Sequence, residues 1–168
     1  MHIELIRADV TSVKLDAIVN PTSPMIQPDI QSGRVVVREG NQEVVRRNGA
    51  SGPLPVGSTI VTSGGNLLTR FVIHAVVPRM GEGDEDAKLR AATWSALQRA
   101  EELAIESVGL PAMSVGPFGF PYERCARIML GTTIDFRRHA RSLQRAIYCL
   151  FGQEAYEVFD RVLKELEA

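Results

Sequence analysis

Cysteine is scarce in this sequence, and no cysteine motif is present. The 168 residues include only two cysteines, Cys125 and Cys149. Two cysteines cannot build a disulfide framework, and without a C-x-x-C pair nothing indicates a zinc site. Both lie in segments with apolar periodicity, so we expect each to be a small buried hydrophobic side chain. We expect neither a metal nor a cofactor.

The chain also lacks an excess of charge of either sign and lacks a long apolar run. Nineteen Lys and Arg residues balance twenty Asp and Glu residues, for a net charge of −1, so no overall field would recruit nucleic acid or an anionic membrane. No stretch approaches about eighteen apolar residues, and the start of the chain has no basic region followed by an apolar run. We therefore expect a cytoplasmic protein without membrane or nucleic-acid partners, in which any anion is held by a local site.

Strand-like and helix-like patterns alternate along the chain, with no repeat, low-complexity tract or linker that would divide it. Short β-branched or apolar runs predict strands at 2–7, 16–20, 58–62, 71–77, 107–111 and 143–151. Helical spacing predicts helices at 35–47, 84–104, 122–136 and 154–166, and three prolines mark 20–34 as a loop. This alternation predicts one α/β domain over residues 1–168, with a parallel or mixed sheet and helices on both faces.

The connection between 112 and 121 has the composition of an anion-binding loop. It reads A-M-S-V-G-P-F-G-F-P and joins a predicted strand to a predicted helix, so its backbone N–H groups can converge on an anion at a helix N-terminus. Gly116 and Gly119 allow the backbone to approach a ligand. Phe118 and Phe120 could offer a flat surface to a ribose or a base, or could instead fill the core.

Five segments of the chain occur in the order seen in one known family. They are D-V-T at 9–11, D-A-I-V-N at 16–20, G-P-L-P-V-G at 52–57, F-V-I-H-A-V-V-P at 71–78 and S-V-G-P-F-G-F-P at 114–121. Together they resemble the macrodomain patterns G-D-I-T, V-N-A-A-N, G-x-A-x-x-T, V-I-H-x-V-x-P and S-T-G-x-x-G-Y-P, and the resemblance extends from residue 3 to residue 166. It implies a three-layer α/β/α fold with a central mixed sheet and a cleft for ADP-ribose.

The resemblance also implies a role for individual residues. Asp9 would accept a hydrogen bond from the adenine amino group, and Phe151 would stack on the adenine, with Tyr156 as the alternative. The 114–118 loop would surround the diphosphate and distal ribose, although Pro117 has no N–H to donate. The full set of candidate ligand-binding residues is Asp9, Val10, Asn20, Ser23, Gly33, Arg34, Val35, Ser114, Val115, Gly116, Pro117, Phe118, Gly119, Phe120 and Phe151.

Structural interpretations compete with these roles. Asp9 could cap a short helical turn ahead of Thr11, and Phe151 could belong to the core. His74 lies in the middle of an apolar strand, and we interpret it as a structural histidine and not as a base.

The sequence departs from the hydrolytic members of the family at three positions. Ser23 stands where the second asparagine of V-N-A-A-N positions the distal ribose or a water, Arg34 interrupts the glycine run, and Val36 replaces an acidic residue. Asp29 or Glu39 could substitute for that acid, but a displaced carboxylate seldom has hydrogen-bond reach to the attacking water. These departures favour binding over catalysis.

Three functions therefore remain open. The leading hypothesis is a reader that binds ADP-ribose, either free or attached to a protein. A hydrolase of ADP-ribosyl groups or of O-acyl-ADP-ribose, using Ser23 or Asp29, is the second, and a degenerate domain that binds a protein partner is the third. Arg34 could pair with the diphosphate or lie in solvent, and the basic segment 137–145 could attract polyanions or form a cationic helix end.

Overall fold

The computed structural model describes residues 1–24, 34–39, 42–47 and 54–168, and describes the backbone alone for 34–39 and 42–47. The strands are β1 (His2–Ile6), β2 (Ala17–Thr22), β3 (Arg34–Glu39), β4 (Gln42–Arg47), β5 (Ser58–Ser63), β6 (Phe71–Val76), β7 (Ser107–Leu110) and β8 (Arg145–Cys149). The helices are α1 (Glu85–Glu102), α2 (Tyr122–Phe136) and α3 (Gln153–Leu166), with short 3₁₀ turns η1 (Val10–Ser12), η2 (Gly116–Phe118) and η3 (Arg137–His139).

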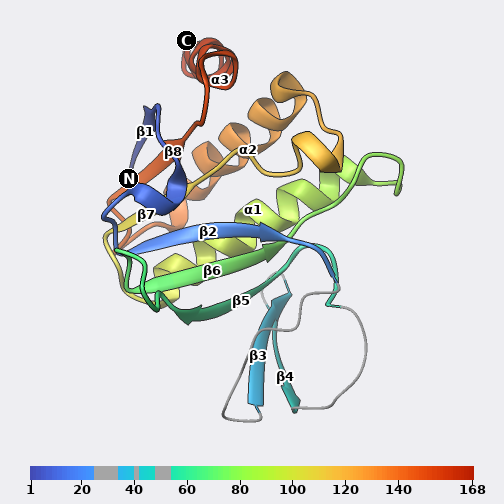
Figure 1. Ribbon diagram of the computed structural model, residues 1–168, viewed down its shortest axis with the longest axis vertical. Coiled ribbons are helices and arrows are strands. Elements are labelled where there is room, and N and C mark those ends of the chain that lie inside the picture. The colour runs from blue at the N-terminus through green and yellow to red at the C-terminus, as the bar shows by residue number, and fades with distance from the viewer. Residues whose placement is uncertain (25–33, 40–41, 48–53) are drawn as a thin grey trace.

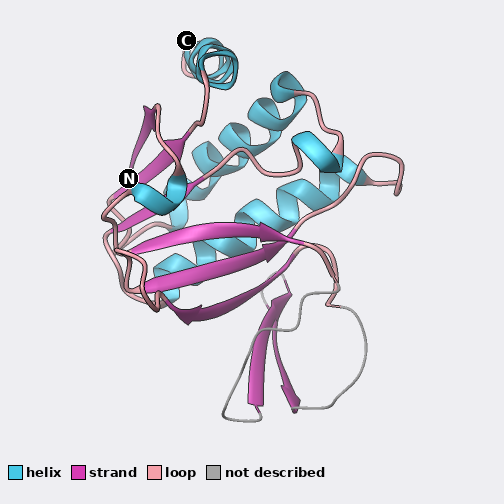
Figure 2. Ribbon diagram, viewed as in Figure 1, coloured by secondary structure: helices cyan, strands magenta, loops and turns pink. Residues whose placement is uncertain are grey.

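Within these ranges the strands form one eight-stranded sheet in the order β1-β8-β7-β2-β6-β5-β3-β4 (Figures 1 and 2). The first five strands in this order run parallel to one another. The remaining three pair antiparallel, β5 with β6, β3 with β5 and β4 with β3. The expected α/β fold around a central mixed sheet is confirmed.

The alternation of side chains along β2 and β6 separates the two faces of the sheet. Ala17, Val19 and Ile73 belong to the main apolar core, which they share with side chains of all three α-helices. Because neighbouring residues of a strand point to opposite faces, Asn20 and His74 lie on the face away from this core. The Asn20–His74 pair therefore points away from the helix layer and is available for other interactions on the opposite face of the sheet.

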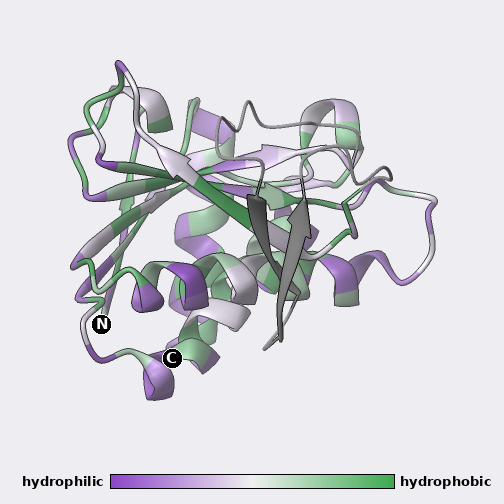
Figure 3. Cartoon of the chain, turned by 90° about the horizontal axis from the view of Figure 1, so that it is seen from below, coloured by the Kyte–Doolittle hydropathy of each residue, from purple (hydrophilic) through white to green (hydrophobic). Residues whose placement is uncertain are grey.

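In the part of the chain that the structure describes, the three α-helices form one packed layer, so the expected α-helices on both faces of the sheet are found on one face only. Helix α1 contacts β5, β6 and α2, and α2 in turn contacts α3. Figures 1 and 3 agree that α1 and α2 lie on the same side of the sheet. In α3 the buried residues Ala155, Phe159 and Val162 repeat at helical spacing, which is the amphipathic pattern that turns one face of a helix to the core.

The helix expected at 35–47 is wrong, because the chain forms strands β3 and β4 there. The two strands pair antiparallel from Arg34↔Arg47 to Glu39↔Gln42. Valines at 35–37 and 44–45 lose side-chain freedom in a helix and favour strands, and the sequence places Gly40-Asn41, a typical hairpin dipeptide, between the two runs. The β-branched residues, which favour strands, were a stronger signal than the spacing of apolar and charged residues, which suggested a helix.

Strand β2 extends two residues further than expected and includes Pro21. Proline cannot donate to a sheet and is therefore tolerated only where a strand lacks a partner on one side. The pairing of β2 with β7 ends at Ile18↔Gly109, whereas its pairing with β6 continues to Thr22↔Val76. Among the described residues, Pro21 thus pairs with β6 alone, and Ser23 follows the end of β2 at the edge of the sheet.

Candidate functional site

Most of the residues predicted to bind a ligand lie at one edge of the sheet. Strands β1, β8, β7, β2 and β6 are parallel, so their carboxyl ends share one edge, which is where α/β folds bind ligands. The amide of Leu150 donates to the Ile6 carbonyl at 2.9 Å there, and the amide of Val77 donates to the Thr22 carbonyl at 3.0 Å. The candidates that directly follow these strands or their turns are Asp9, Val10, Ser23, the loop at 111–121 and Phe151.

Asp9 caps the turn η1, as the structural interpretation expects. Its Oδ1 accepts hydrogen bonds from the Thr11 amide at 2.8 Å and from the Thr11 hydroxyl at 2.7 Å. These bonds lower the pKa of Asp9 below its usual value, so the carboxylate stays ionised. Both bonds end on Oδ1, and no described residue donates to Oδ2. Capping therefore leaves one oxygen of an exposed carboxylate available to a ligand.

The backbone amides of the 114–120 loop divide into two groups. The amides of Phe118, Gly119 and Phe120 donate within the loop, to the carbonyls of residues 115, 116 and 114 at 3.4, 2.9 and 2.8 Å. By contrast, the amides of Ser114, Val115 and Gly116 donate to none of the described residues. Three successive free N–H groups remain in the first half of the loop, and Pro117 contributes none.

Ser114 holds the start of this loop in an unusual conformation. It has a φ of +65° without being glycine, which costs free energy unless the surroundings impose it. The Ser114 side chain is 2% exposed, and its hydroxyl donates to the Pro78 carbonyl at 2.8 Å. The Met80 amide donates to the Phe118 carbonyl at 2.9 Å. The 78–80 segment thus fixes the loop from one side.

The aromatic side chains of the loop have different environments. Phe120 is 3% exposed and belongs to the main core, so it fills space inside the protein. Phe118 is half-buried, and the guanidinium of Arg79 lies over its ring at 4.7 Å from the centroid. Arg79 was not among the predicted residues. Its position directly after the V-I-H-A-V-V-P strand, beside the glycine-rich loop, was the available signal.

Phe151 follows β8 and is 81% exposed. It does not pack into the core, and so large an apolar side chain in solvent leaves surface free for a partner. Tyr156, the alternative, is half-buried against the core on α3. Of the two aromatic candidates, Phe151 offers the open ring face.

The pair Asn20 and His74 lies two residues before the end of β2. Asn20 Nδ2 lies 3.2 Å from His74 Nδ1, and His74 Nε2 lies 2.8 Å from Thr62 Oγ1 on β5. Burial lowers the pKa of His74. Both ring nitrogens have partners and the ring favours its neutral form, which agrees with a structural histidine.

The remaining candidates come from the segment between β2 and β3. Ser23 is half-buried just after β2, and Arg34 and Val35 open β3, where only the backbone is described. Gly33 and Asp29 lie outside the described residues. Their predicted roles stay predictions.

The two cysteines are buried, as expected. Burial raises the pKa of Cys125 to about 12 and that of Cys149 to about 11, so both remain thiols and neither is a nucleophile at neutral pH. Within the described part of the chain, no three His, Cys, Asp or Glu side chains lie close enough to hold a metal ion.

Comparison with known proteins identifies the family. The family model described as Macro domain matches residues 30–129. This chain belongs to the Macro domain family. An uncharacterized protein of Sulfolobus acidocaldarius is 40% identical to it, over 96% of this chain and 90% of that protein.

Solved macrodomains share the fold. A variant of the Oceanobacillus iheyensis macrodomain superposes with a TM-score of 0.82 at 24% identity, covering 98% of this chain and 92% of that one. The Trypanosoma brucei macrodomain, solved in complex with ADP-ribose, superposes with a TM-score of 0.74 at 26% identity, covering 95% and 68%. The macrodomain architecture of this chain is therefore shown by sequence and by structure.

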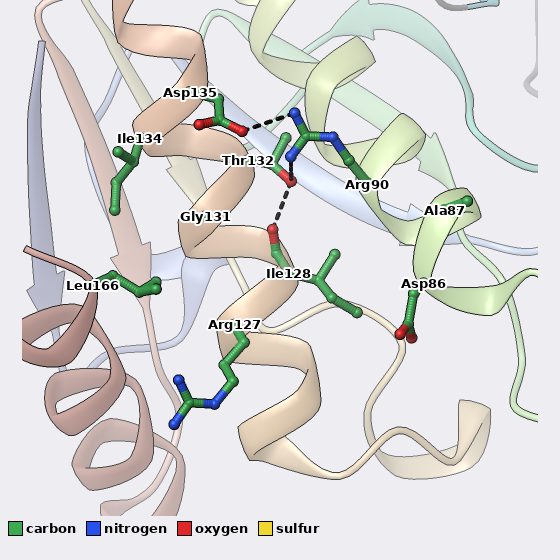
Figure 4. A pocket seen from close by; sticks show the side chains of 10 residues that line it. All are labelled: Asp86, Ala87, Arg90, Arg127, Ile128, Gly131, Thr132, Ile134, Asp135 and Leu166. Atoms are coloured by element: carbon green, nitrogen blue, oxygen red, sulfur yellow. Dashed lines mark hydrogen bonds and ion pairs between the residues drawn. The ribbon is translucent and has the colours of Figure 1, made fainter.

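The macrodomain also has a hollow of about 490 Å³ between its helices, lined by Asp86, Ala87, Arg90, Arg127, Ile128, Gly131, Thr132, Ile134, Asp135 and Leu166 (Figure 4). Its charged groups already have protein partners. Arg90 donates to Asp135 at 2.9 Å and to the Thr132 hydroxyl at 3.4 Å, and Arg127 pairs with Glu123 and Glu165. This hollow lacks free groups that would recognise a charged ligand.

The basic segment after α2 is partly neutralised. Arg137 pairs with Glu167 at 2.6 Å, and Arg145 pairs with Glu4 at 2.7 Å. These pairs favour the interpretation as a cationic helix end over a site for polyanions. No helix among the described residues is both long enough and apolar enough to cross a bilayer.

Proposed function

We propose that this macrodomain binds ADP-ribose, free or attached to a protein, and acts as a reader of that group. The observation that carries the proposal is the run of three amides at 114–116 that donate to no described residue. They lie at the sheet edge that also holds the ionised Asp9 and the exposed Phe151. An anion-binding backbone, a hydrogen-bond acceptor and an aromatic plate are the groups that an adenine nucleotide requires.

Each part of the ligand has a corresponding group. Successive backbone N–H groups bind phosphate oxygens well because the fold already orients their dipoles toward the anion. We assign the pyrophosphate to the amides of Ser114, Val115 and Gly116, since those of residues 118–120 are used within the loop. The free oxygen of Asp9 would accept from the adenine amino group, and Phe151 would stack on the ring. The complex of the Trypanosoma brucei macrodomain with ADP-ribose supports ADP-ribose as the ligand.

Binding without hydrolysis fits the residues near the end of β2. Ser23 offers a hydroxyl in place of the paired donor and acceptor of an asparagine amide. The acid that hydrolases place after the glycine run is Val36 here. None of the described residues is assigned as a carboxylate that activates a water, which supports recognition over hydrolysis.

Calorimetric titration with ADP-ribose tests the proposal. We expect saturable binding of one ligand per chain, and the absence of heat and of a thermal shift at millimolar ligand would contradict it. Incubation with an ADP-ribosylated protein tests the reader role separately. A reader releases no ADP-ribose beyond the rate in buffer, whereas release by the macrodomain would show a hydrolase.

Arg79 is expected to contribute to the affinity. Its guanidinium lies over the Phe118 ring at 4.7 Å from the centroid, beside the loop proposed to bind the pyrophosphate, and its N–H groups could donate to phosphate oxygens. No described residue forms an ion pair with it. Replacing Arg79 by alanine should weaken ADP-ribose binding by about threefold to tenfold, the effect of one partly screened charge-assisted hydrogen bond.

Arg70→Ala is the matched control for this prediction. Arg70 is also exposed and lies over an aromatic ring, that of Phe71 at 5.2 Å, but at the opposite end of β6. The R79A variant should lose the salt dependence that R70A keeps, as measured by calorimetry at two ionic strengths. Equal affinities of R79A and R70A would exclude Arg79 from the site.

A further inference from the structure

A hydrogen-bonded row crosses three neighbouring strands, β2, β6 and β5, which lie side by side in Figure 1. It runs from Asn20 Nδ2 to His74 Nδ1 at 3.2 Å and from His74 Nε2 to Thr62 Oγ1 at 2.8 Å. The Thr62 hydroxyl continues it by donating to the Ser63 carbonyl at 3.2 Å. The row lies on the sheet face away from the helices, and Asn20 is its exposed end.

The direction of the bonds in the row follows from placing the Thr62 proton on its hydrogen bond to the Ser63 carbonyl. A hydroxyl has one proton, and Thr62 gives its proton to the Ser63 carbonyl, which can only accept. Thr62 Oγ1 must therefore accept from His74, so the proton of the neutral ring lies on Nε2. Nδ1 is then an acceptor, and only the Asn20 amide nitrogen can donate to it. As long as Thr62 donates to the Ser63 carbonyl, none of the hydrogen bonds in the row can change its direction.

These directions determine which atom of the Asn20 amide is available to a ligand. Its amide nitrogen faces His74, so its Oδ1 is the atom available to a ligand. With the other tautomer of His74, the amide would turn over and present a donor instead. We propose that His74 and Thr62 are positioning residues that make Asn20 present a hydrogen-bond acceptor, which suits a sugar hydroxyl and disfavours a phosphate oxygen.

This inference rests on the proposed function for its ligand, but not for the row itself. Nitrogen NMR of the histidine rings reports the tautomer without any ligand. We expect His74 to carry its proton on Nε2 in the wild type, and to become a mixture of tautomers in Thr62→Val, which keeps the shape and removes the hydroxyl. A proton on Nδ1 in the wild type, or the same tautomer in T62V as in the wild type, would overturn the inference.

Affinity for ADP-ribose is the second readout. We expect T62V to bind about threefold to tenfold more weakly, the effect of one misdirected hydrogen bond, and Thr62→Ser, which restores the hydroxyl, to recover most of the loss. Thr59→Val is the matched control. Thr59 lies on the same strand but points to the other face, is 0% exposed, and its hydroxyl has no partner among the described residues.

The outcomes separate the two proposals. If the wild type does not bind ADP-ribose, the proposed function fails, and the NMR result alone decides on the row. If the wild type binds and T62V binds as tightly as T59V, the proposed function stands and the positioning role of Thr62 and His74 is refuted. Loss of affinity in T62V without recovery in T62S would also refute it, since packing and not the hydroxyl would then be responsible.

Discussion

Replacing Asp9 by asparagine should weaken ADP-ribose binding by about tenfold to a hundredfold. A hydrogen bond to a charged group contributes about 1.5–3 kcal/mol, and each 1.4 kcal/mol or so is a factor of ten in the dissociation constant. The substitution keeps the cap, because an amide oxygen can still accept from the Thr11 amide and hydroxyl. It places an NH₂ group opposite the adenine amino group, where two donors meet. Calorimetry of both proteins measures the change.

A ligand with hypoxanthine in place of adenine provides the control for Asp9→Asn. Hypoxanthine presents a carbonyl oxygen where adenine presents its amino group, so it should bind the wild type weakly and D9N better. Thermal unfolding should show the same stability for both proteins. If D9N bound ADP-ribose as the wild type does, Asp9 would be a structural cap only, and the purine would be recognised elsewhere.

The sequence predicted the architecture because the relevant patterns are local. Helix α2 begins at Tyr122 and ends at Phe136, as its apolar spacing predicts. The parallel strands could be placed because short apolar runs alternate with helices, and their shared carboxyl edge follows from topology alone. The helix predicted at 35–47 was wrong because the valines and charges there fit both the helical and the strand periodicity. β-branching and the Gly40-Asn41 dipeptide were the signals that favoured two strands.

The sequence places the candidate site at one edge of the sheet, but it does not show which groups of the site are available to a ligand. Residues 114–120 include three amides that donate to no described residue and three that donate within the loop, and this division depends on the positive φ angles of Ser114, Gly116 and Gly119. Composition cannot give those angles for a serine. Likewise Phe120 and Phe151 both follow a glycine or a strand end, yet one is 3% and the other 81% exposed.

The same difference in exposure leads to the other large expected effect. Replacing Phe151 by alanine should weaken ADP-ribose binding by about fivefold to a hundredfold, because stacking of a base on an aromatic ring is worth ~1–3 kcal/mol. It should leave the free energy of unfolding almost unchanged, since the ring is 81% exposed and packs on little of the protein. Calorimetry and thermal unfolding of the same samples measure the two quantities.

Two further variants decide whether stacking is the cause. Phe151→Trp keeps an aromatic plate and should bind at least as tightly as the wild type, whereas Phe151→Leu keeps apolar bulk and should bind almost as weakly as F151A. Tyr156→Ala tests the alternative aromatic, and because Tyr156 packs partly on the core its loss should lower stability more than affinity. Equal affinity of F151A and the wild type, together with a large loss in Y156A, would move the adenine from the end of β8 to helix α3.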